Sequence, residues 1–413
     1  MKILHVNKFV YRRGGAEGYM LDVADLQRRE GHEVEFFGMQ HPDNIEATYT
    51  EHFPSQVEFG QHDASIVERI QLSGRMMYSS SARRGIGEVL DDFAPDIVHL
   101  NNIYHQLSPS ILRPIAKRGI PAVLTLHDYK LACPTYQFLA DGEICEACIG
   151  GHFSHAIRKR CNRGSLAASI ASATELAVHT RFGAYNSIDL FLCPSVFLST
   201  QMERANVYPD RLRHNPNFVD LGKIEPAQRP GDGIVFAGRL SHEKGVDVLI
   251  DAAAALGEEL HIAGSGPDAA VLEERAASAG AKVTFHGRLA TDELHELMRR
   301  SRVSVLPARW YENQPLSVLE SYGCAVPVIA SDLGGLPEIV VPGVTGDLVP
   351  PNDFDSLAAA LKPYVEDADL AYQHGIEGRK MVEREYSPRV HLARLHGFYD
   401  EAIERRDRRG SSG

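Results

Sequence analysis

The sequence lacks an apolar run of the roughly 18–20 residues that a membrane-spanning helix needs, and it has no heptad pattern, low-complexity tract or short internal repeat. Its opening segment, MKILHVNKF, is interrupted by His5, Asn7 and Lys8, so we expect no signal peptide there. Membrane-spanning and coiled-coil proteins are therefore excluded from the classes we consider. We expect a cytoplasmic protein, with peripheral contact at the inner face of the membrane left open.

Basic residues are also in short supply, because 43 Lys and Arg stand against 55 Asp and Glu, for a net charge of −12. The phosphate backbone of a nucleic acid binds best to a basic surface, so we expect no nucleic-acid partner for this acidic chain. A local basic cleft can still bind one anionic ligand. The apolar fraction of 44% and the charged fraction of 24% are ordinary for folded proteins, and a length of 413 residues suggests two or three domains.

Short apolar runs recur along the chain and are typical of buried strands. A turn at Gly14-Gly15 and a helical pattern from Met20 to Leu26 separate the first two runs, which makes a βαβ unit, the building block of parallel sheets. The same pattern restarts after residue 215. The predicted strands are 2–6, 34–38, 96–100, 122–128 and 190–195 in the first half, and 233–240, 260–266, 283–289, 303–307 and 327–331 in the second.

This pattern predicts an α/β fold with two Rossmann-like doubly wound domains that face a cleft. We place the first domain at 1–214 and the second at 215–386, joined through the segment 214–220. Residues 387–413 form a closing helix, about 388–406, and a tail from 405 that we expect to fray. Ligands of such folds bind where loops leave the carboxyl ends of the strands, so we look for chemistry there.

Charged residues follow two predicted strands of the second domain. Glu312 and Glu320 stand eight apart around the start of a helix, and carboxylates accept hydrogen bonds from vicinal hydroxyls. The plainer alternative is charge that complements the helix dipole. Arg239 and Lys244 follow another strand and can converge on one diphosphate, or they are simply two surface cations.

Glycines and one histidine mark further loops. Gly264 and Gly266 permit close backbone approach, although turn geometry explains them equally well. Gly14 and Gly15 open a helix whose backbone amides can meet a phosphate, but they do not form the dinucleotide fingerprint. His127 ends an apolar strand, where it either contacts a sugar hydroxyl or plays a structural part.

Taken together, these parts resemble retaining glycosyltransferases of the GT-B fold, specifically glycosyltransferase family 4. The resemblance rests on GGAE (14–17), His127, GRLSHEKG (238–245), AGSGP (263–267) and the E-x7-E stretch 312–320, supported by SDLGGLPEIV (331–340) and the closing helix. It implies a first domain on the acceptor side and a second domain that binds a nucleotide sugar. The closing helix would then cross back to the first domain.

The resemblance also implies roles for individual residues. Arg239 and Lys244 would neutralise the donor diphosphate, and amides near Leu316 and Ser317 would bind its oxygens. Glu312 would hold donor-sugar hydroxyls and Glu320 the nucleotide ribose. The remaining implied donor-site residues are Gly14, Gly15, Gly264, Gly266, His127 facing the sugar, and Gly287, Arg288 and Leu289 at the base edge.

The reaction implied is transfer of a hexose to a hydroxyl with retention at the anomeric carbon, by a front-face route. Cationic side chains and helix amides would stabilise the leaving diphosphate, so no catalytic metal is expected. The implied partners are a UDP-, GDP- or dTDP-hexose donor and a glycan, glycolipid or lipid-linked acceptor. Tailoring of a small secondary metabolite, a binding protein without turnover, a nucleotide-sugar epimerase and a phosphorylase stay open as alternatives.

Four of the six cysteines gather in one insert, 133–161. Cys133, Cys145, Cys148 and Cys161 have the spacing C-x11-C-x2-C-x12-C, which allows a structural zinc site, with His152 or His155 as substitute ligands. Free thiols or a disulfide are the alternatives. We expect the insert to form a rigid knuckle that shapes the acceptor entrance. The remaining cysteines, Cys193 and Cys324, are predicted to be core residues.

A basic run follows the paired cysteines, because no acidic residue lies between Glu146 and Glu175. It predicts either a solvated surface or contact with an anionic membrane or a lipid-diphosphate acceptor. Acceptor identity should depend on the insert and on residues 40–85. The cations of this run are Arg158, Lys159, Arg160 and Arg163.

Overall fold

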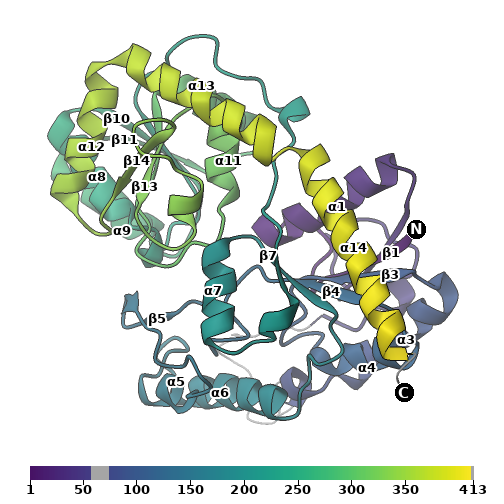
Figure 1. The fold of residues 1–413 in the computed structure, drawn as a ribbon. Helices are drawn as coiled ribbons and strands as arrows, with labels where there is room; N and C mark the ends of the chain where they lie inside the picture. The colour runs from purple at the N-terminus through teal and green to yellow at the C-terminus, as the bar shows by residue number, and fades with distance from the viewer. Residues whose placement is uncertain (57–73, 411–413) are drawn as a thin grey trace.

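The computed structural model describes residues 1–56 and 74–410. Within them the chain forms two six-stranded sheets, each wholly parallel, and one small antiparallel pair. Helices cover both faces of each sheet (Figure 1). The predicted α/β fold with two Rossmann-like domains is therefore confirmed.

The first sheet has the order β2-β1-β3-β4-β7-β8. Its strands are buried almost throughout, as expected of apolar segments covered on both faces. Helices α3, α6 and α7 each begin at a serine whose side chain accepts a backbone N–H, the usual helix start. The bounds are β1 Lys2–Val6, α1 Gly15–Arg29, β2 Glu33–Phe37, α3 Ser80–Phe93, β3 Ile97–Leu100, α4 Leu112–Lys117, β4 Ala122–Thr125, α6 Leu166–Arg181, β7 Leu190–Cys193, α7 Val196–Arg204 and β8 Leu212–His214.

The second sheet has the order β11-β10-β9-β12-β13-β14. The strand order reverses between β9 and β12, and open parallel sheets bind ligands beyond the carboxyl ends of their strands at such a reversal. The bounds are β9 Ile234–Ala237, α8 Val246–Leu256, β10 Glu259–Ala263, α9 Ala269–Ala279, β11 Lys282–Gly287, α10 Thr291–Arg300, β12 Val303–Leu306, α11 Leu316–Gly323, β13 Val328–Ser331, β14 Gly346–Val349 and α12 Phe354–Glu366.

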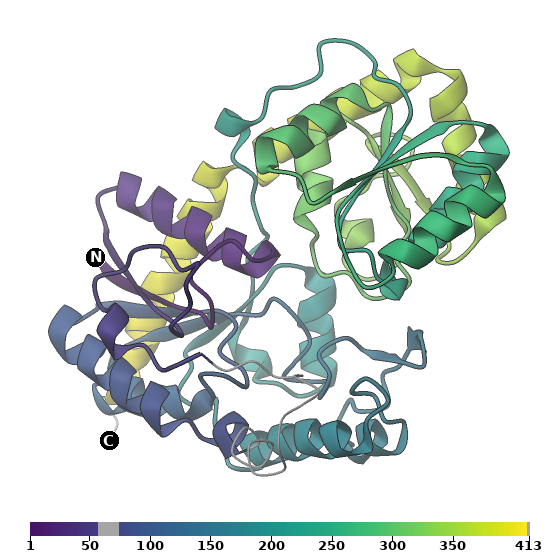
Figure 2. The ribbon, with the colours of Figure 1, turned by 180° about the vertical axis from the view of Figure 1, so that it is seen from behind.

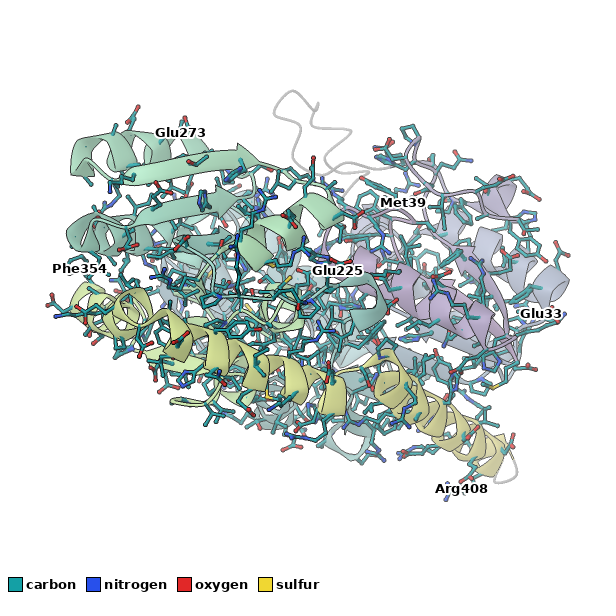
Figure 3. The ribbon with its side chains drawn as sticks, turned by 90° about the horizontal axis from the view of Figure 1, so that it is seen from above. Glu33, Met39, Glu225, Glu273, Phe354 and Arg408 are labelled. Carbon is teal, nitrogen blue, oxygen red and sulfur yellow. The ribbon has the colours of Figure 1, made fainter. Side chains whose placement is uncertain are left out.

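Two consecutive helices join the lobes at the end of the chain. Helix α13 (Ala368–Glu385) lies on the second lobe and α14 (Pro388–Gly410) crosses to the first. Figure 3 shows this run extending along the molecule between Phe354 and Arg408. Leu392, Leu395 and Tyr399 of α14 are buried in the core of the first lobe. The predicted crossover helix is thus present.

The frayed tail expected from residue 405 is wrong for the part that the structure describes. The chain stays helical to Gly410 because three arginines bond to carboxylates of the first lobe. Arg405 pairs with Asp210 at 3.1 Å, and Arg406 and Arg409 pair with the fully buried Asp189 at 2.6 and 3.2 Å. These ion pairs fix the end of α14.

The cysteine-bearing insert leaves the first sheet after β4 and returns before α6. It contains the hairpin β5 (Leu139–Ala140) and β6 (Glu143–Ile144), followed by helix α5 (Ser154–Arg158). Figure 2, seen from behind, shows it extending beneath the second lobe. Of the acceptor-side segment 40–85, residues 57–73 lie outside the described residues.

Candidate active site

Two loops of the second lobe carry the residues that are predicted to bind the diphosphate and the sugar. One glycine allows these two loops to pack closely against each other. The loop after β9 ends at Gly245, whose φ is +66°. A Cβ at this position would lie 2.0 Å from the carbonyl oxygen of Pro307, in the loop after β12. Glycine is therefore required, and it brings Lys244 beside the loop that carries Glu312.

Lys244 and Glu312 form an ion pair at 2.5 Å with little exposure to solvent. The side chain of Lys244 is 16% exposed and that of Glu312 is 7% exposed. The backbone of Glu312 is held as well, because its carbonyl accepts the N–H of Gly335 at 2.7 Å. The pair places a cation and a carboxylate in the loops that follow β9 and β12, where the strand order reverses.

Sequence reasoning missed a third member of this group, Trp310. Its indole N–H donates to Oε1 of Glu312 at 2.7 Å. The ammonium of Lys244 lies 5.4 Å from the centre of the Trp310 ring, within the range of a cation–π contact. No motif in the sequence singles out this tryptophan.

The start of helix α11 faces the first lobe. Pro315 precedes it and no side chain caps it, so the amides of Leu316 and Ser317 are available to an anion. Opposite stands Gly15, at the start of α1: a Cβ there would lie 3.9 Å from Cδ1 of Leu316. The structure thus brings the two predicted amide groups, at Gly14-Gly15 and at Leu316-Ser317, to opposite sides of one gap.

Arg239 is exposed, and its charge acts on Tyr136 in the insert of the first lobe. Gly264 and Gly266 serve close packing, because a Cβ would lie 1.8 Å from the Gly238 carbonyl and 2.1 Å from the Leu240 carbonyl, respectively. These glycines therefore let the loop after β10 pack against the loop that carries Arg239.

The residues predicted to contact the ribose and the base of the nucleotide are Glu320, Arg288 and Leu289. Nε2 of His295 lies 3.8 Å from Glu320, whose side chain is 23% exposed. Arg288 is exposed and donates to the backbone carbonyl of Arg12 at 3.1 Å, across the lobes, while Leu289 is partly buried. Arg12, which sequence reasoning also missed, feels the charge of Glu320.

His127 lies two residues beyond β4, because that strand ends at Thr125 instead of the predicted 128. Its Nε2 bonds with Oδ1 of Asn101 at 2.8 Å. Burial, aided by the Lys8 cation, lowers the pKa of His127 to about 3, so the ring is neutral at physiological pH. It can donate or accept a hydrogen bond but does not supply a positive charge.

The residue next to Glu312 ties the loop to the first lobe. Asn313 accepts from the Ser195 hydroxyl at 2.6 Å and donates to the carbonyl of Leu126 at 3.2 Å. Leu126 precedes His127, so this amide links the histidine loop with the Glu312 loop. Glu338, to which sequence reasoning assigned no role, accepts the N–H groups of Val196 and Phe197 at the start of α7, at 2.8 and 2.6 Å.

None of the six cysteines forms a disulfide, so the disulfide alternative is not what the structure shows. Cys148 packs with Phe153, Ala156, Ala173 and Leu176 in a small apolar cluster. Among residues 1–56 and 74–410, three ligand-type side chains come within 4.8 Å of one another only at Glu30, His32 and His396, away from the insert. The zinc site at the four cysteines of the insert stays a prediction.

None of the helices in the described part of the chain is long and apolar enough to cross a membrane.

Comparisons with known proteins agree with this arrangement. The family model described as "Glycosyltransferase Family 4" matches residues 13–223, and "Glycosyl transferases group 1" matches residues 224–381. Together they cover both lobes and the loops described above.

Two curated relatives illustrate the similarity. Alpha-maltose-1-phosphate synthase of Mycolicibacterium smegmatis is 31% identical over 43% of this chain. A GDP-mannose-dependent phosphatidylinositol monomannoside mannosyltransferase of Corynebacterium glutamicum is 32% identical over 44% of this chain. The chain spans about half the length of these relatives, 54% in each case.

Solved structures share the whole fold. Sucrose-phosphate synthase of Thermosynechococcus elongatus superposes with a TM-score of 0.71 at 19% identity, over 98% of this chain and 99% of that one. The Anabaena protein HepE, solved in complex with UDP, gives 0.68 at 17% identity, over 97% and 100%. At such identities the likeness concerns the fold alone.

Proposed function

This chain belongs to glycosyltransferase family 4, and on that premise we propose that it moves a hexose from a nucleotide-diphosphate sugar to a hydroxyl of a glycan, glycolipid or lipid-linked acceptor. The observation that carries the proposal is the meeting of Lys244, Glu312 and the uncapped start of α11 at the reversal of strand order. There a cation and backbone amides surround the place where a diphosphate would leave.

In the proposed reaction the bond between the anomeric carbon and the diphosphate oxygen breaks, and the acceptor oxygen bonds to the same face of that carbon. The acceptor proton passes to the leaving diphosphate. Lys244, Arg239 and the amides of Leu316 and Ser317 stabilise the charge that develops on this group, which is the largest catalytic contribution that such a site offers. Glu312 holds the sugar hydroxyls, and the neutral ring of His127 faces them.

We propose that the residues before 215 form the acceptor lobe and residues 215–386 the donor lobe. The proximity of Gly15 to Leu316, and the hydrogen bonds of Asn313 with Ser195 and Leu126, support closure of one lobe on the other around the donor. Closure would exclude water, which strengthens the electrostatic stabilisation in the cleft.

Release of nucleoside diphosphate tests this proposal. Purified protein is incubated with UDP-, GDP- and dTDP-hexoses in EDTA, alone and with candidate acceptors, beside Glu312→Ala. We expect one donor class to be turned over by the wild type and far less by the variant. Binding of a sugar nucleotide without turnover would favour a binding protein, and conversion to an isomeric sugar nucleotide an epimerase.

Parallel assays with different acceptors distinguish transfer to a glycan or lipid-linked acceptor from transfer to a small metabolite. A panel of small hydroxylated metabolites is tested beside oligosaccharide and lipid-linked acceptors. Transfer to a small metabolite alone would replace the glycan proposal with tailoring of a small metabolite.

Peripheral membrane contact is proposed for the surface of the insert. Arg158, Lys159, Arg160 and Arg163 are exposed there. Leu166 and Ile170, on the next helix, are 45% and 44% exposed. Cations beside exposed apolar side chains suit an anionic bilayer surface. Co-sedimentation with anionic vesicles should exceed that with neutral ones, and equal sedimentation would contradict the proposal.

A further inference from the structure

We propose that Trp310 is the positioning residue that fixes the carboxylate of Glu312 for the donor sugar, and that the ion pair between Lys244 and Glu312 loosens when the donor diphosphate arrives. The inference rests on the proposed function, because it concerns the same site. It assigns a task to a side chain that neither the motifs nor the family match identifies.

Two donors meet at one oxygen of Glu312. Oε1 accepts both from Lys244 Nζ, at 2.5 Å, and from the Trp310 indole N–H, at 2.7 Å. The carboxylate is thus held through a single oxygen by two donors. Oε2 makes no hydrogen bond with any residue that the structure describes, which leaves it to receive a hydroxyl.

The two donors differ in how freely they can move. The ammonium carries three N–H groups and sits on a flexible stem, so it can turn towards a diphosphate, which offers more negative charge than one carboxylate. The indole has one N–H on a rigid, half-buried ring. When Lys244 turns away, Trp310 is the donor that stays on Glu312.

The orientation of the Glu312 carboxylate needs a restraint. Rotation about the last torsion of a glutamate side chain is broad, so an unrestrained Glu312 would sample many planes. Two sugar hydroxyls require one plane. The backbone is already fixed by Gly335, and the indole bond fixes the end of the side chain.

Trp310 is also the one tryptophan of the sequence. Lys244 lies over its ring at 5.4 Å, so movement of the ammonium changes the surroundings of the only indole. Tryptophan emission therefore reports on this contact without a background from other sites.

The experiment compares Trp310→Phe with wild type. The probes are UDP, GDP and dTDP for calorimetric binding, and the sugar nucleotide found in the turnover screen for hydrolysis. We expect Trp310→Phe to keep the dissociation constant for the nucleoside diphosphate within about twofold and to lower kcat about ten- to a hundredfold, the usual effect of losing a hydrogen bond to a charged group. Tyr372→Phe, which loses a hydroxyl bond to the Ala227 carbonyl, is the matched control and should retain both values.

A second readout needs no variant. Tryptophan emission of the wild type should change saturably with the nucleoside diphosphate, with the dissociation constant found by calorimetry. Unchanged kcat in folded Trp310→Phe, or binding with constant emission, would overturn the inference. Absence of any binding and turnover in the wild type would instead overturn the proposed function, so the two failures are distinguishable.

Discussion

At the scale of single residues, the main cation and carboxylate of the site are paired with each other. Lys244 is neutralised by Glu312. A sugar nucleotide brings both a diphosphate and hydroxyls, so it could replace Glu312 as the partner of Lys244 and Lys244 as a partner of Glu312. Arg239 is exposed and forms no ion pair with another described residue, so it could bind a diphosphate without first breaking one.

Neutralising the two glutamates of the E-x7-E stretch should affect different properties, turnover in one case and nucleoside diphosphate affinity in the other. Glu312→Gln should lower turnover about ten- to a hundredfold, because the charge-assisted bonds to sugar hydroxyls weaken. Its affinity for the nucleoside diphosphate should not fall, since Lys244 is freed for the phosphates. Glu320→Gln should instead weaken nucleoside diphosphate binding about tenfold. Calorimetry and hydrolysis rates check this, and the same pattern in both variants would contradict the assigned roles.

At the scale of elements, helix α14 holds a buried histidine at the junction of the lobes. His391 bonds to the Tyr19 hydroxyl at 3.1 Å and to the Pro216 carbonyl at 2.7 Å. Tyr19 also packs edge-on against His127. The crossover helix, the connecting segment and the histidine loop therefore share one packed group of side chains.

This histidine makes stability depend on pH. Burial lowers the pKa of His391 to about 4, below the ordinary value of 6.5. Between these values the unfolded chain binds the proton and the folded chain does not, so the free energy of unfolding falls as the pH drops from 6.5 towards 4. The slope is about 1.4 kcal/mol per pH unit for one histidine.

Denaturant unfolding at pH 7, 6 and 5 measures this slope. His391→Gln should be less stable at pH 7 but should lose less stability on acidification than the wild type. His5, whose pKa burial also lowers to about 4, continues to contribute in both proteins. Equal slopes for the two proteins would rule out the contribution of His391.

The insert offers a separate test at the same scale. Its own apolar cluster is small, and small segments of this kind commonly need a metal or a disulfide to hold their shape. We predict about one zinc ion per chain in metal analysis of untagged protein. Cys148→Ser should lose it and Cys193→Ser, in β7, should retain it. A wild-type ratio near zero would end the zinc prediction.

The elements also show what the sequence can and cannot predict. Apolar runs such as 303–307 identify central strands because both faces are buried. Edge strand β8 was missed, since Leu212 is the one apolar residue in it. The frayed tail was predicted wrongly because the partner of Arg406, Asp189, lies far away in the sequence.

The same reason applies to the site. Motifs identified Lys244 and Glu312, which the fold brings together. They did not include Trp310 and assigned no role to Glu338, because the hydrogen-bond partners of both are set by the folded loops and by contact between the lobes.

At the scale of the whole molecule, the chain crosses between the lobes twice (Figure 1), and polar contacts link the lobes as well. The carboxylate of Glu338 on the second lobe holds the start of α7 on the first. Such bonds to a charged acceptor are stronger than neutral ones. They therefore help to hold the two lobes together.

Removing that carboxylate should open the molecule. Glu338→Ala should increase the radius of gyration measured by small-angle scattering and raise KM for the donor at least about tenfold, because both charge-assisted hydrogen bonds to the start of α7 are lost. Glu366→Ala, whose carboxylate pairs with Lys362 on the surface of the second lobe, is the control. A radius and KM equal to those of the control would argue against this role for Glu338.

The most direct test of the account asks whether the cleft grips a diphosphate through fixed cations. Calorimetry in EDTA compares UDP, GDP and dTDP with uridine, guanosine and thymidine, for the wild type and Lys244→Met. We predict that one diphosphate binds far more tightly than its nucleoside and that Lys244→Met weakens this binding at least tenfold. Binding that needs a divalent cation, or that Lys244→Met leaves unchanged, would contradict the account.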